Sequence, residues 1–498
     1  MAKSPNQIEE KIAGIKKQLL EIGEMRPGSL TYQYRKPKEK DGGFYRVCLK
    51  YNVFSALQSY LSREFQEVPM TARIVKTSSD TLTVEVQIPF GRSLLESEEF
   101  IQQALNEAGT VATAQTLERF DADGSPIEVG GLKFTSKGRL PKTYQTPYGE
   151  TRVERHVYQS ATGGKTYCPL EVTGRIVMTA TPRFAKILSY KYADLGLSRL
   201  CQDLEISNGR KVLRSYAHKI GELVGSVAEL KEEVWTYQTP VLDAEIATVT
   251  VGLDGTCMLM REDGWREAMV GTVGLYDKEG ERQHTIYIGA SPEYGKETFL
   301  SRLETEIGHV KKAYGNALFM GLADGAKGNW GFLEKHTERQ VVDFYHAAGY
   351  LADAADAYFE KRPKERKAWL DARCHDLKHK RGAAHRILRE MDAWTVEVEW
   401  KEGPRWELLK GALDYFMNNT DKNRMSYGEY VKENLPIGSG VTEAGCKVIV
   451  KQRLCNSGMR WKDKGARVVL SLRCLTHTPG RWNQFWDKID QYGFQMAA

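Results

Sequence analysis

The sequence predicts a mixed α/β protein in which a sheet-containing core is interrupted by a long helical segment. Three observations predict this class. Strand-like runs at 249–256, 268–277 and 282–291 are followed by alternating helical and strand-like patterns up to residue 346. Residues 347–435 have helical periodicity throughout. After Pro436, glycines 438 and 440 precede a further helix-forming run, which we expect to return the chain to the core.

Composition limits the class of protein. A chain of 498 residues corresponds to about three domains of roughly 150 residues. No stretch approaches the ~18 apolar residues of a membrane span, and residues 1–22 lack an apolar signal core, so we expect a cytoplasmic protein without membrane segments. The eight cysteines form no C-x-x-C pair, which favours a reducing compartment. Cys374, His375 and His379 come closest to a metal-binding spacing, but they stand among many cations.

The order of elements between residues 249 and 346 predicts a particular sheet. The three strand-like runs are followed by a helix over 296–313, a strand over 318–322, a short helix over 330–335 and a strand over 340–346. This is the order of an RNase H-like fold, in which the first and fourth strands lie side by side. Asp254 ends the first run and Asp324 follows the fourth, so we expect their carboxylates to be neighbours.

Asp254, Asp324 and Glu443 form the candidate catalytic and metal-binding set. A carboxylate at the end of a buried strand is costly unless it is paired, hydrogen-bonded or bound to a metal. Glu443 lies in the first turns of a helix rich in basic residues. Carboxylate oxygens suit Mg²⁺ or Mn²⁺, and three of them can hold two ions about 3.5–4 Å apart for attack on a phosphodiester. Because the chain has 65 acidic residues, this choice depends on their context.

The N-terminal part shows weaker patterns. We expect an amphipathic helix over 6–22, a helix near 53–64, a hairpin whose second strand is 81–88, two helices over 94–120 and an extended ribbon over 140–172.

Residues 183–235 have a helix-turn-helix pattern. Two amphipathic runs precede a turn at 207–209, and a longer helix follows whose start contains Arg210, Lys211 and Arg214. Basic residues at the start of a recognition helix reach base edges and phosphates. Three-helix packing without DNA is the alternative.

Two dense basic stretches indicate a polyanionic partner, most simply nucleic acid. Residues 361–386 contain ten Lys and Arg against three acidic residues, and residues 444–498 have the same counts. In the second stretch we expect DNA contacts from Lys447, Lys451, Arg453, Arg460, Trp461 and Lys462. Trp461 would stack on an unpaired base or, alternatively, pack on Val448 and Leu454, and either stretch could instead be a solvated helix face.

Several runs resemble one known family. VGLDGT, LADGAKGNW, DFYHAAGYL and GSGVTEAGCKVIVKQRLCNSGMRW resemble the catalytic core of bacterial insertion-sequence transposases of the ISKra type, which are DDE enzymes akin to the Mutator-like group. ALNEAGTVATAQTLERFDADGSPI and KTYQTPYGETRVERHVYQSATGGKTYCPLE resemble its N-terminal region. The resemblance covers roughly residues 95–480, with a weaker one in EIGEMRPGSL to a small accessory domain. A cysteine pair of some relatives is absent, because only Cys168 is present in the ribbon, so zinc is not implied.

The resemblance implies a function and roles for particular residues. Asp254, Asp324 and Glu443 would be the catalytic triad, holding two Mg²⁺ or Mn²⁺ ions. Asp343 and His346 match a D-x-x-H element near the site, where His346 would contact the scissile phosphate or brace the metal ligands, unless it is a core histidine bonded to Asp343. The implied partners are double-stranded DNA, as terminal inverted repeats and as target, and further copies of the chain in a homodimer or higher oligomer.

Together these patterns predict five regions and a DNA transposase. The regions are an N-terminal accessory region (1–95), a DNA end-binding region with the helix-turn-helix (96–240), the first part of the catalytic core (241–346), a helical insertion (347–435), and the second part of the core with a basic tail (436–498). The alternatives are an RNase H-like nuclease or resolvase without strand transfer and a catalytically silent DNA-binding regulator.

Overall fold

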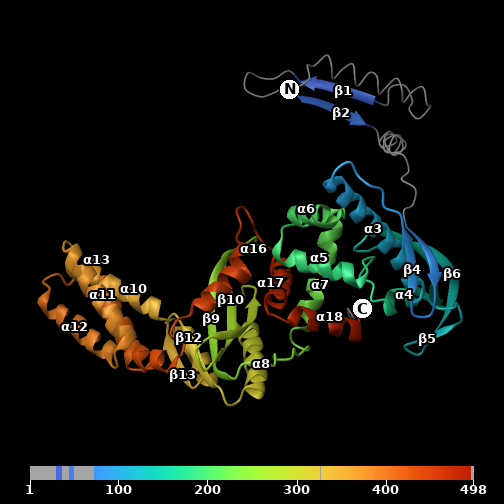
Figure 1. Cartoon of the computed structure of the whole chain (residues 1–498). Helices are drawn as coiled ribbons and strands as arrows, with labels where there is room; N and C mark the ends of the chain where they lie inside the picture. The colour runs from blue at the N-terminus through green and yellow to red at the C-terminus, as the bar shows by residue number, and fades with distance from the viewer. Residues whose placement is uncertain (1–29, 36–43, 50–71, 326, 495–498) are drawn as a thin grey trace. The chain divides into compact units, whose positions relative to one another are not determined.

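The computed structural model describes residues 30–35, 44–49, 72–325 and 327–494 (Figure 1). The chain divides into two compact units, Met1–Ala108 and Gly109–Ala498. The helices predicted at 6–22 and near 53–64 lie outside the described residues. Among the described residues, no helix is both long and apolar enough to cross a membrane.

Within the first unit the described strands form two antiparallel pairs. These are β1 (Leu30–Arg35) with β2 (Phe44–Leu49) and β3 (Ala72–Thr77) with β4 (Leu82–Val86). The second pair is the hairpin that the sequence predicted.

One helix, α3 (Leu94–Glu118), occupies the span in which two helices were expected. Two hydrogen bonds hold its start: the Glu96 amide donates to Ser93 Oγ at 3.2 Å, and the Arg92 amide donates to the Glu96 carboxylate. No proline interrupts the span, so the helix continues.

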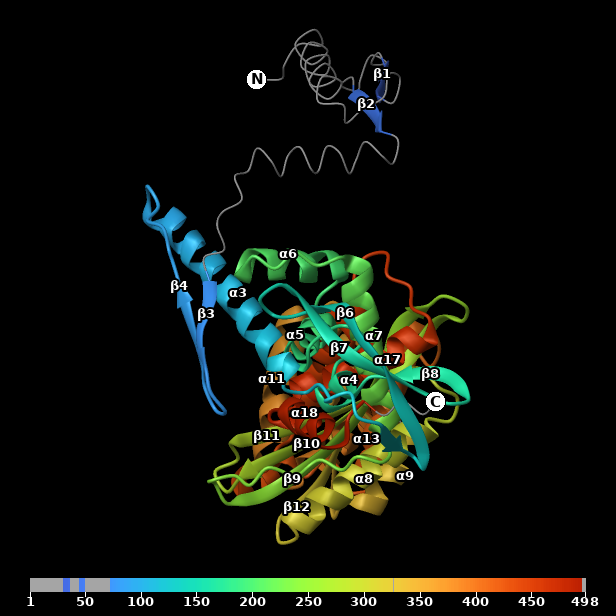
Figure 2. The same ribbon diagram turned by 90° about the vertical axis from the view of Figure 1, so that its right-hand side faces the viewer.

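The predicted ribbon is a four-stranded antiparallel sheet. Its order is β5 (Ile127–Val129), β6 (Leu132–Gln145), β7 (Glu150–Ser160) and β8 (Gly163–Tyr167), and the short helix α4 (Pro169–Thr173) follows. Figure 2 shows the long β6–β7 pair as a twisted ribbon.

Three helices follow in the region of the predicted helix-turn-helix. They are α5 (Pro182–Asp194), α6 (Leu197–Asn208) and α7 (Arg214–Lys231). Their apolar faces share one hydrophobic cluster with the C-terminal helices α17 (Asp463–His477) and α18 (Arg481–Tyr492). The sequence assigned these helices to separate regions, but they belong to one core.

A five-stranded mixed sheet lies in the middle of the second unit. Its order is β11 (Arg282–Ala290), β10 (Gly264–Asp277), β9 (Ile246–Met260), β12 (Leu318–Ala323) and β13 (Arg339–Val342), with α8 (Glu297–Ala313) and α9 (Lys327–His336) between strands in the chain. Strands β9, β10 and β11 are antiparallel, whereas β12 is parallel to β9 and β13 to β12. The predicted adjacency of the first and fourth strands is confirmed.

Two strand boundaries differ from the prediction. We expected the first strand to end at Asp254, but β9 continues to Met260 because β10 pairs with it along its whole length. We expected the last strand to include Asp343 and His346, but β13 ends at Val342 and Asp343 caps the next helix.

The insertion is helical, as predicted. It contains α10 (Phe344–Phe359), α11 (Pro363–His379), α12 (Ala383–Glu397), α13 (Pro404–Thr420) and the short α14 (Tyr427–Tyr430). These helices extend the hydrophobic cluster of the sheet. Figure 1 shows them on the side of the sheet where β12 and β13 lie, with α5, α7 and α17 on the other side.

The chain returns to the sheet through a helical segment of mixed type. It consists of α15 (Gly440–Gly445), a π-helical stretch (Cys446–Lys451) and α16 (Gln452–Leu454). A π-helical stretch inside an α-helix is rare and is frequently found at functional sites.

Candidate active site

Asp254 lies within β9 at the point where one neighbouring strand stops. Strand β12 pairs with β9 only as far as Gly252, while β10 pairs with it beyond Asp254. The Gly255 amide donates to Asp254 Oδ1 at 2.7 Å, and the Cys446 thiol lies 3.6 Å from Oδ2. The long strand therefore holds Asp254 firmly, beside a stretch that β12 does not cover.

Asp324 directly follows β12, in the position that the sequence predicted. Gly325 has a φ of +108°, which allows the chain to turn there, and a side chain at this position would meet the ring of Tyr415 at 2.8 Å. The Tyr415 hydroxyl, from insertion helix α13, donates to the backbone oxygen of Asp324 at 2.9 Å, and its ring stacks on Tyr350. The insertion thus braces the loop that presents Asp324.

Close packing of α15 on the sheet brings Glu443 to the same place. A Cβ at Gly252 would lie 2.1 Å from Thr442 Oγ1, so only glycine leaves room for α15 here. Thr442 Oγ1 and Thr272 Oγ1 share a hydrogen bond of 2.7 Å between the helix and β10. This contact holds the helical turn that carries Glu443.

The three predicted carboxylates influence one another electrostatically. Burial raises the pKa of Asp254, and the negative charges of Asp324 and Glu443 raise it further, against the opposing effect of the hydrogen bonds from Gly255 and Cys446. An open groove is lined by Asp254 and Glu443 together with Lys447 and Lys451. Asp254, Asp324 and Glu443 therefore form one electrostatic cluster that comes from two strands and a helix.

A tighter group involves the other two predicted near-site residues. Asp343, His346 and Glu443 each offer one possible metal-ligand atom, and these three atoms lie within 4.8 Å of one another. In the described part of the chain, this is the group of three His, Cys, Asp or Glu residues that meets this distance. His346 Nε2 lies 3.4 Å from Glu443 Oε1. Ser439 Oγ lies 3.0 Å from Asp343 Oδ2 and 3.2 Å from Glu443 Oε1. The tightest set of possible metal ligands is thus not Asp254, Asp324 and Glu443.

Asp343 and His346 have different roles in this group. Asp343 is fully buried and caps α10, since its Oδ1 accepts from the His346 amide at 2.8 Å and its Oδ2 accepts from the Ser439 amide. The His346 side chain is 45% exposed, and Asp343 bonds to its backbone rather than its ring. The alternative of a core histidine bonded to Asp343 was therefore wrong.

One of the three basic residues expected at the start of the recognition helix is buried. Arg210 is 6% exposed and donates to the backbone oxygens of Thr146 and Lys211, each at 3.0 Å. Helix α7 begins only at Arg214, so Arg210 precedes it and faces the protein, which corrects the expectation of a DNA contact. Lys211 and Arg214 are exposed.

The cations that follow Glu443 divide into exposed and buried residues. Lys447, Lys451, Arg460 and Lys462 are exposed, and within the described part of the chain none forms an ion pair within 4.0 Å. Arg453 is 4% exposed, so it is not a contact on the open surface.

Trp461 has features of both the packing interpretation and the base-stacking interpretation. The indole is partly buried against the cluster that contains Leu454, and its Nε1 donates to the Leu454 backbone oxygen at 2.9 Å, as the packing alternative expected. It also lines a pocket, which is described below.

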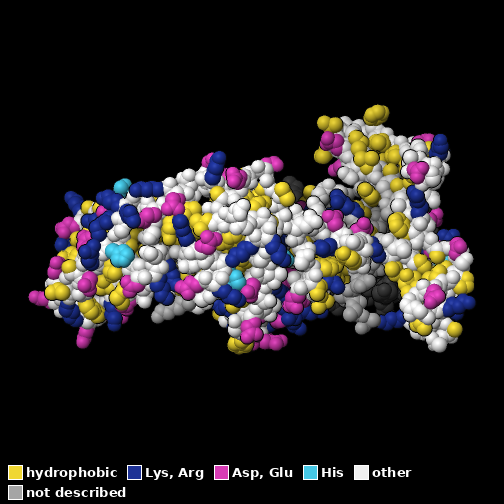
Figure 3. Space-filling view, turned by 90° about the horizontal axis from the view of Figure 1, so that it is seen from below, with side chains coloured by type: hydrophobic (Ala, Val, Ile, Leu, Met, Phe, Trp, Pro, Cys, Tyr) yellow, Lys and Arg dark blue, Asp and Glu magenta, His cyan; other side chains and the backbone are white. Residues whose placement is uncertain are grey.

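Half of the cations in the basic stretch of the insertion form ion pairs with nearby acids. Arg362, Arg366, Arg373, Lys380 and Arg381 all form ion pairs. Figure 3 shows Lys and Arg side chains interspersed with Asp and Glu over this end of the molecule. These pairs favour the solvated-face alternative for residues 361–386.

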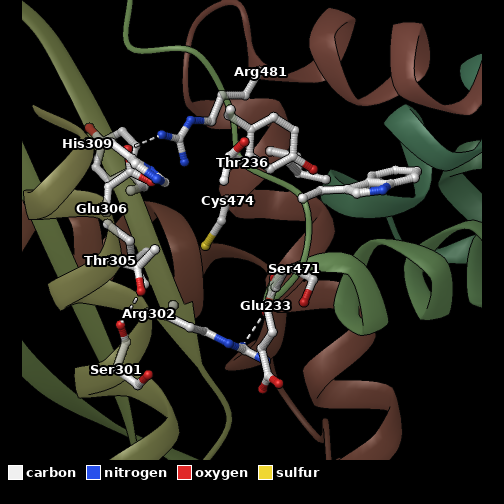
Figure 4. A pocket seen from close by; sticks show the side chains of 17 residues that line it. Glu233, Thr236, Ser301, Arg302, Thr305, Glu306, His309, Ser471, Cys474 and Arg481 are labelled. Carbon is white, nitrogen blue, oxygen red and sulfur yellow. Dashed lines mark hydrogen bonds and ion pairs between the residues drawn. The ribbon is translucent and has the colours of Figure 1, made fainter. Parts of the chain in front are cut away.

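A more enclosed cavity lies away from the carboxylates (Figure 4). It is bounded by the end of α7, α8, β11 and α17, and has a volume of about 210 Å³. Its two arginines are engaged within the protein, Arg302 with Glu232 and Arg481 with Glu306. Both arginines that line the cavity are therefore paired, and the Arg302–Glu232 pair ties the segment after α7 to α8.

Sequence reasoning missed several residues that shape the site. Asn329 donates to the Leu253 backbone oxygen at 3.4 Å next to Asp254, and Cys446 contacts Asp254. Both residues lie inside the runs LADGAKGNW and GSGVTEAGCKVIVK, so the motifs could have indicated them. Tyr415 lies in an ordinary helical run and has no sequence signal.

The residues present fit divalent cations. Asp254, Asp324 and Glu443 offer oxygen ligands, which hard cations prefer. Burial and, to a smaller extent, the charges of Asp324 and Glu443 raise the pKa of Asp254, and a bound cation would offset both effects.

Comparison with known proteins gives no family assignment. No protein-family model matches the chain, and no curated protein matches it. Among solved structures, the chain is similar to the Drosophila P element transposase strand transfer complex, with a TM-score of 0.23 and 9% identity over 62% of this chain and 80% of that chain. At this TM-score the likeness carries no argument, so the proposal below depends on the sequence motifs and the geometry of the site.

Proposed function

We propose that the chain is a DDE-type DNA transposase with an RNase H-like catalytic core. The sheet order β11-β10-β9-β12-β13, with three antiparallel strands followed by two parallel ones, supports this fold. The motif resemblance to ISKra-type transposases supports the same assignment, because its runs contain Asp254, Asp324, Asp343, His346 and Glu443 in order.

The observation that carries the proposal is the convergence of three carboxylates. Asp254 from β9, Asp324 after β12 and Glu443 from α15 are close enough that the latter two raise the pKa of the first. Two divalent cations bound there would activate the attacking oxygen and stabilise the leaving oxygen. Phosphoryl transfer of this type needs mainly positioning and charge stabilisation from the protein.

The DNA partner is double-stranded, as element ends and as target. Lys447 and Lys451 line the groove beside Glu443 and would contact backbone phosphates. Lys211, just before α7, and Arg214, the first residue of α7, would contribute to recognition of the terminal inverted repeats. Two or more copies of the chain would pair two element ends.

A strand-transfer assay tests this function against its alternatives. Full-length protein, Mg²⁺, labelled DNA from the ends of the encoding element and a supercoiled target plasmid are incubated together. A transposase gives cleaved ends and labelled DNA joined to the plasmid. Cleavage without joined product would indicate a nuclease or resolvase, and specific binding without cleavage a silent regulator. Asp254→Asn is the control, and it should bind DNA without cleaving it.

A further inference from the structure

A basic and aromatic pocket lies between the α5–α7 helices and the segment that follows α16. Its volume is about 710 Å³, and it is as open to solvent as the groove beside Asp254. The residues that give it chemical character are Tyr192, His218, Arg261, Arg453, Arg460 and Trp461. No acidic side chain is among the described residues that line it, so the pocket is electropositive.

Arg453 is the least expected residue of this pocket. It is 4% exposed, its Nε has no hydrogen-bond acceptor, and in the described part of the chain no carboxylate forms an ion pair with it. Burial lowers the pKa of its guanidinium. Among the described residues, its favourable contacts are the rings of Tyr192 and Trp461 and the more distant negative charge of Asp194, and a buried cation without a hydrogen-bonded carboxylate is costly. Its position on the pocket wall therefore indicates an anion that comes from outside the chain.

The neighbours of Arg453 suit a nucleotide rather than a simple anion. Its guanidinium lies 5.2 Å from the ring centre of Trp461 and 5.8 Å from that of Tyr192. The hydrogen bond from Trp461 Nε1 to the Leu454 backbone fixes the indole. Exposed Arg261 and Arg460 add charge at the mouth. Cations beside a fixed aromatic ring are the combination that binds the phosphate and base of an unpaired nucleotide.

One helical segment connects this pocket to the carboxylates. Glu443 lies near its start and Arg453 near its end, roughly 15 Å apart at 1.5 Å per residue. Exposed Lys447 and Lys451 lie between them. At about 3.4 Å per nucleotide, a strand running along this segment would reach the pocket some four nucleotides from the carboxylates.

We propose that this pocket binds one unpaired nucleotide of the DNA strand held at the active site, with its phosphate at Arg453 and its base against Trp461. The inference rests on the proposed function, and it adds a specific preference for DNA that is single-stranded next to the cleavage point.

The test compares binding of two DNAs by the full-length protein in EDTA, where cleavage plays no part. One is a blunt duplex, and the other has the same duplex with an unpaired overhang of about five nucleotides, enough to span roughly 15 Å. We expect the overhang to tighten binding on the order of tenfold. The double variant Arg261→Gln/Arg460→Gln and the variant Trp461→Leu should each lose most of this advantage, while Trp461→Phe should keep it.

Controls separate the pocket from general charge and from folding. Lys278→Gln/Arg282→Gln removes two exposed cations at the opposite end of β10 and should leave the ratio of the two affinities unchanged. If the Arg453→Gln variant folds, as judged by its melting temperature, it should bind the overhang DNA and the blunt duplex with equal affinity. If it does not fold, the variants of the exposed residues still test the pocket.

Three outcomes would overturn the proposal. The first is equal affinity of the unaltered protein for both DNAs. The second is an unchanged ratio of the two affinities in Arg261→Gln/Arg460→Gln. The third is tight, pocket-dependent binding of free dTMP without any advantage for the overhang, which would reassign the pocket to a free nucleotide. Failure of the proposed function is distinct, since it would appear as no cleavage in Mg²⁺ whatever the ratio.

Discussion

At the scale of single residues, the site separates side chains that hold the fold from side chains available for chemistry. Asp343 is buried and accepts bonds from two backbone amides, whereas His346 is half exposed and faces Glu443. The same sequence motif therefore contains one positioning residue and one residue that can reach a substrate. Arg210 and Arg214 divide in the same way, since the first is bonded inside the protein and the second is exposed.

We predict that His346→Ala slows DNA cleavage by about 10- to 100-fold while changing the free energy of unfolding by less than about 0.5 kcal/mol, because its side chain is half exposed. Asp343→Ala should instead cost about 2 kcal/mol or more, since it leaves the Ser439 and His346 amides without their acceptor. Single-turnover cleavage and denaturant unfolding measure both. A strongly destabilised His346→Ala would show that its role is structural.

At the scale of elements, packing of α15 on the sheet decides where Glu443 lies. The contact depends on Gly252, two residues before Asp254, and on the Thr442–Thr272 hydrogen bond. The mixed-type helical segment then carries exposed cations away from the carboxylates.

Gly252→Ala should displace α15, because its Cβ would lie 2.1 Å from Thr442 Oγ1. We expect a loss of about 1–3 kcal/mol in stability together with loss of cleavage. Adding Thr442→Ala should recover part of the stability, which a double-mutant cycle measures. Gly308→Ala, where a Cβ meets nothing within 4 Å, is the control and should be neutral or stabilising. Equal effects at both glycines would contradict this account of the packing.

The exposed cations after Glu443 should set part of the salt dependence of DNA binding. Replacing Lys447, Lys451 and Lys462 together by Gln should flatten the slope of log K against log salt by about 3 units, because each phosphate contact contributes about 0.9. Lys278→Gln, Arg282→Gln and Lys312→Gln together remove the same charge elsewhere on the surface and should leave the slope as it is. An unchanged slope in the first variant would show that these lysines face only solvent.

Much of the element order could be predicted from sequence, but the lengths of elements could not. Alternating apolar residues predicted the strands, helical periodicity predicted the insertion, and the order of the elements predicted the adjacency of β9 and β12. The continuation of β9 past Asp254 depends on pairing with β10, and the end of β13 on the cap by Asp343; both are tertiary features. Likewise, the composition of residues 361–386 does not reveal that half of their cations form ion pairs. The composition of residues 210–214 does not reveal that Arg210 is buried.

At the scale of the whole second unit, α5–α7 and the C-terminal helices share one core, so the helices expected to bind DNA ends are fixed to the five-stranded sheet. Glu232, just after α7, extends this attachment through its ion pair with Arg302 on α8. Burial raises the pKa of Glu232 from 4.5 to about 7, even though Arg302 acts to lower it.

Burial of the Glu232 carboxyl group predicts a pH dependence of stability. Between about pH 4.5 and 7 the unfolded state releases the Glu232 proton and the folded state keeps it, so stability falls as the pH rises through this window, by on the order of 3 kcal/mol. Below the window both states are protonated, and above it both are ionised. The melting temperature of Glu232→Gln should therefore fall less than that of the unaltered protein between pH 5 and 7.5. Parallel pH profiles would mean that Glu232 is already ionised in the folded protein.

The most direct test of the central claim is Mg²⁺-dependent, single-turnover cleavage of labelled element-end DNA, with binding measured on the same samples. Asp254→Asn, Asp324→Asn and Glu443→Gln each remove one ligand charge with little change in shape. The account predicts that each variant binds DNA as the unaltered protein does but cleaves at least a thousandfold more slowly, roughly 4 kcal/mol in the barrier. Near-normal cleavage by any one of them would contradict the assignment of that residue, and near-normal cleavage by all three would contradict the proposed active site.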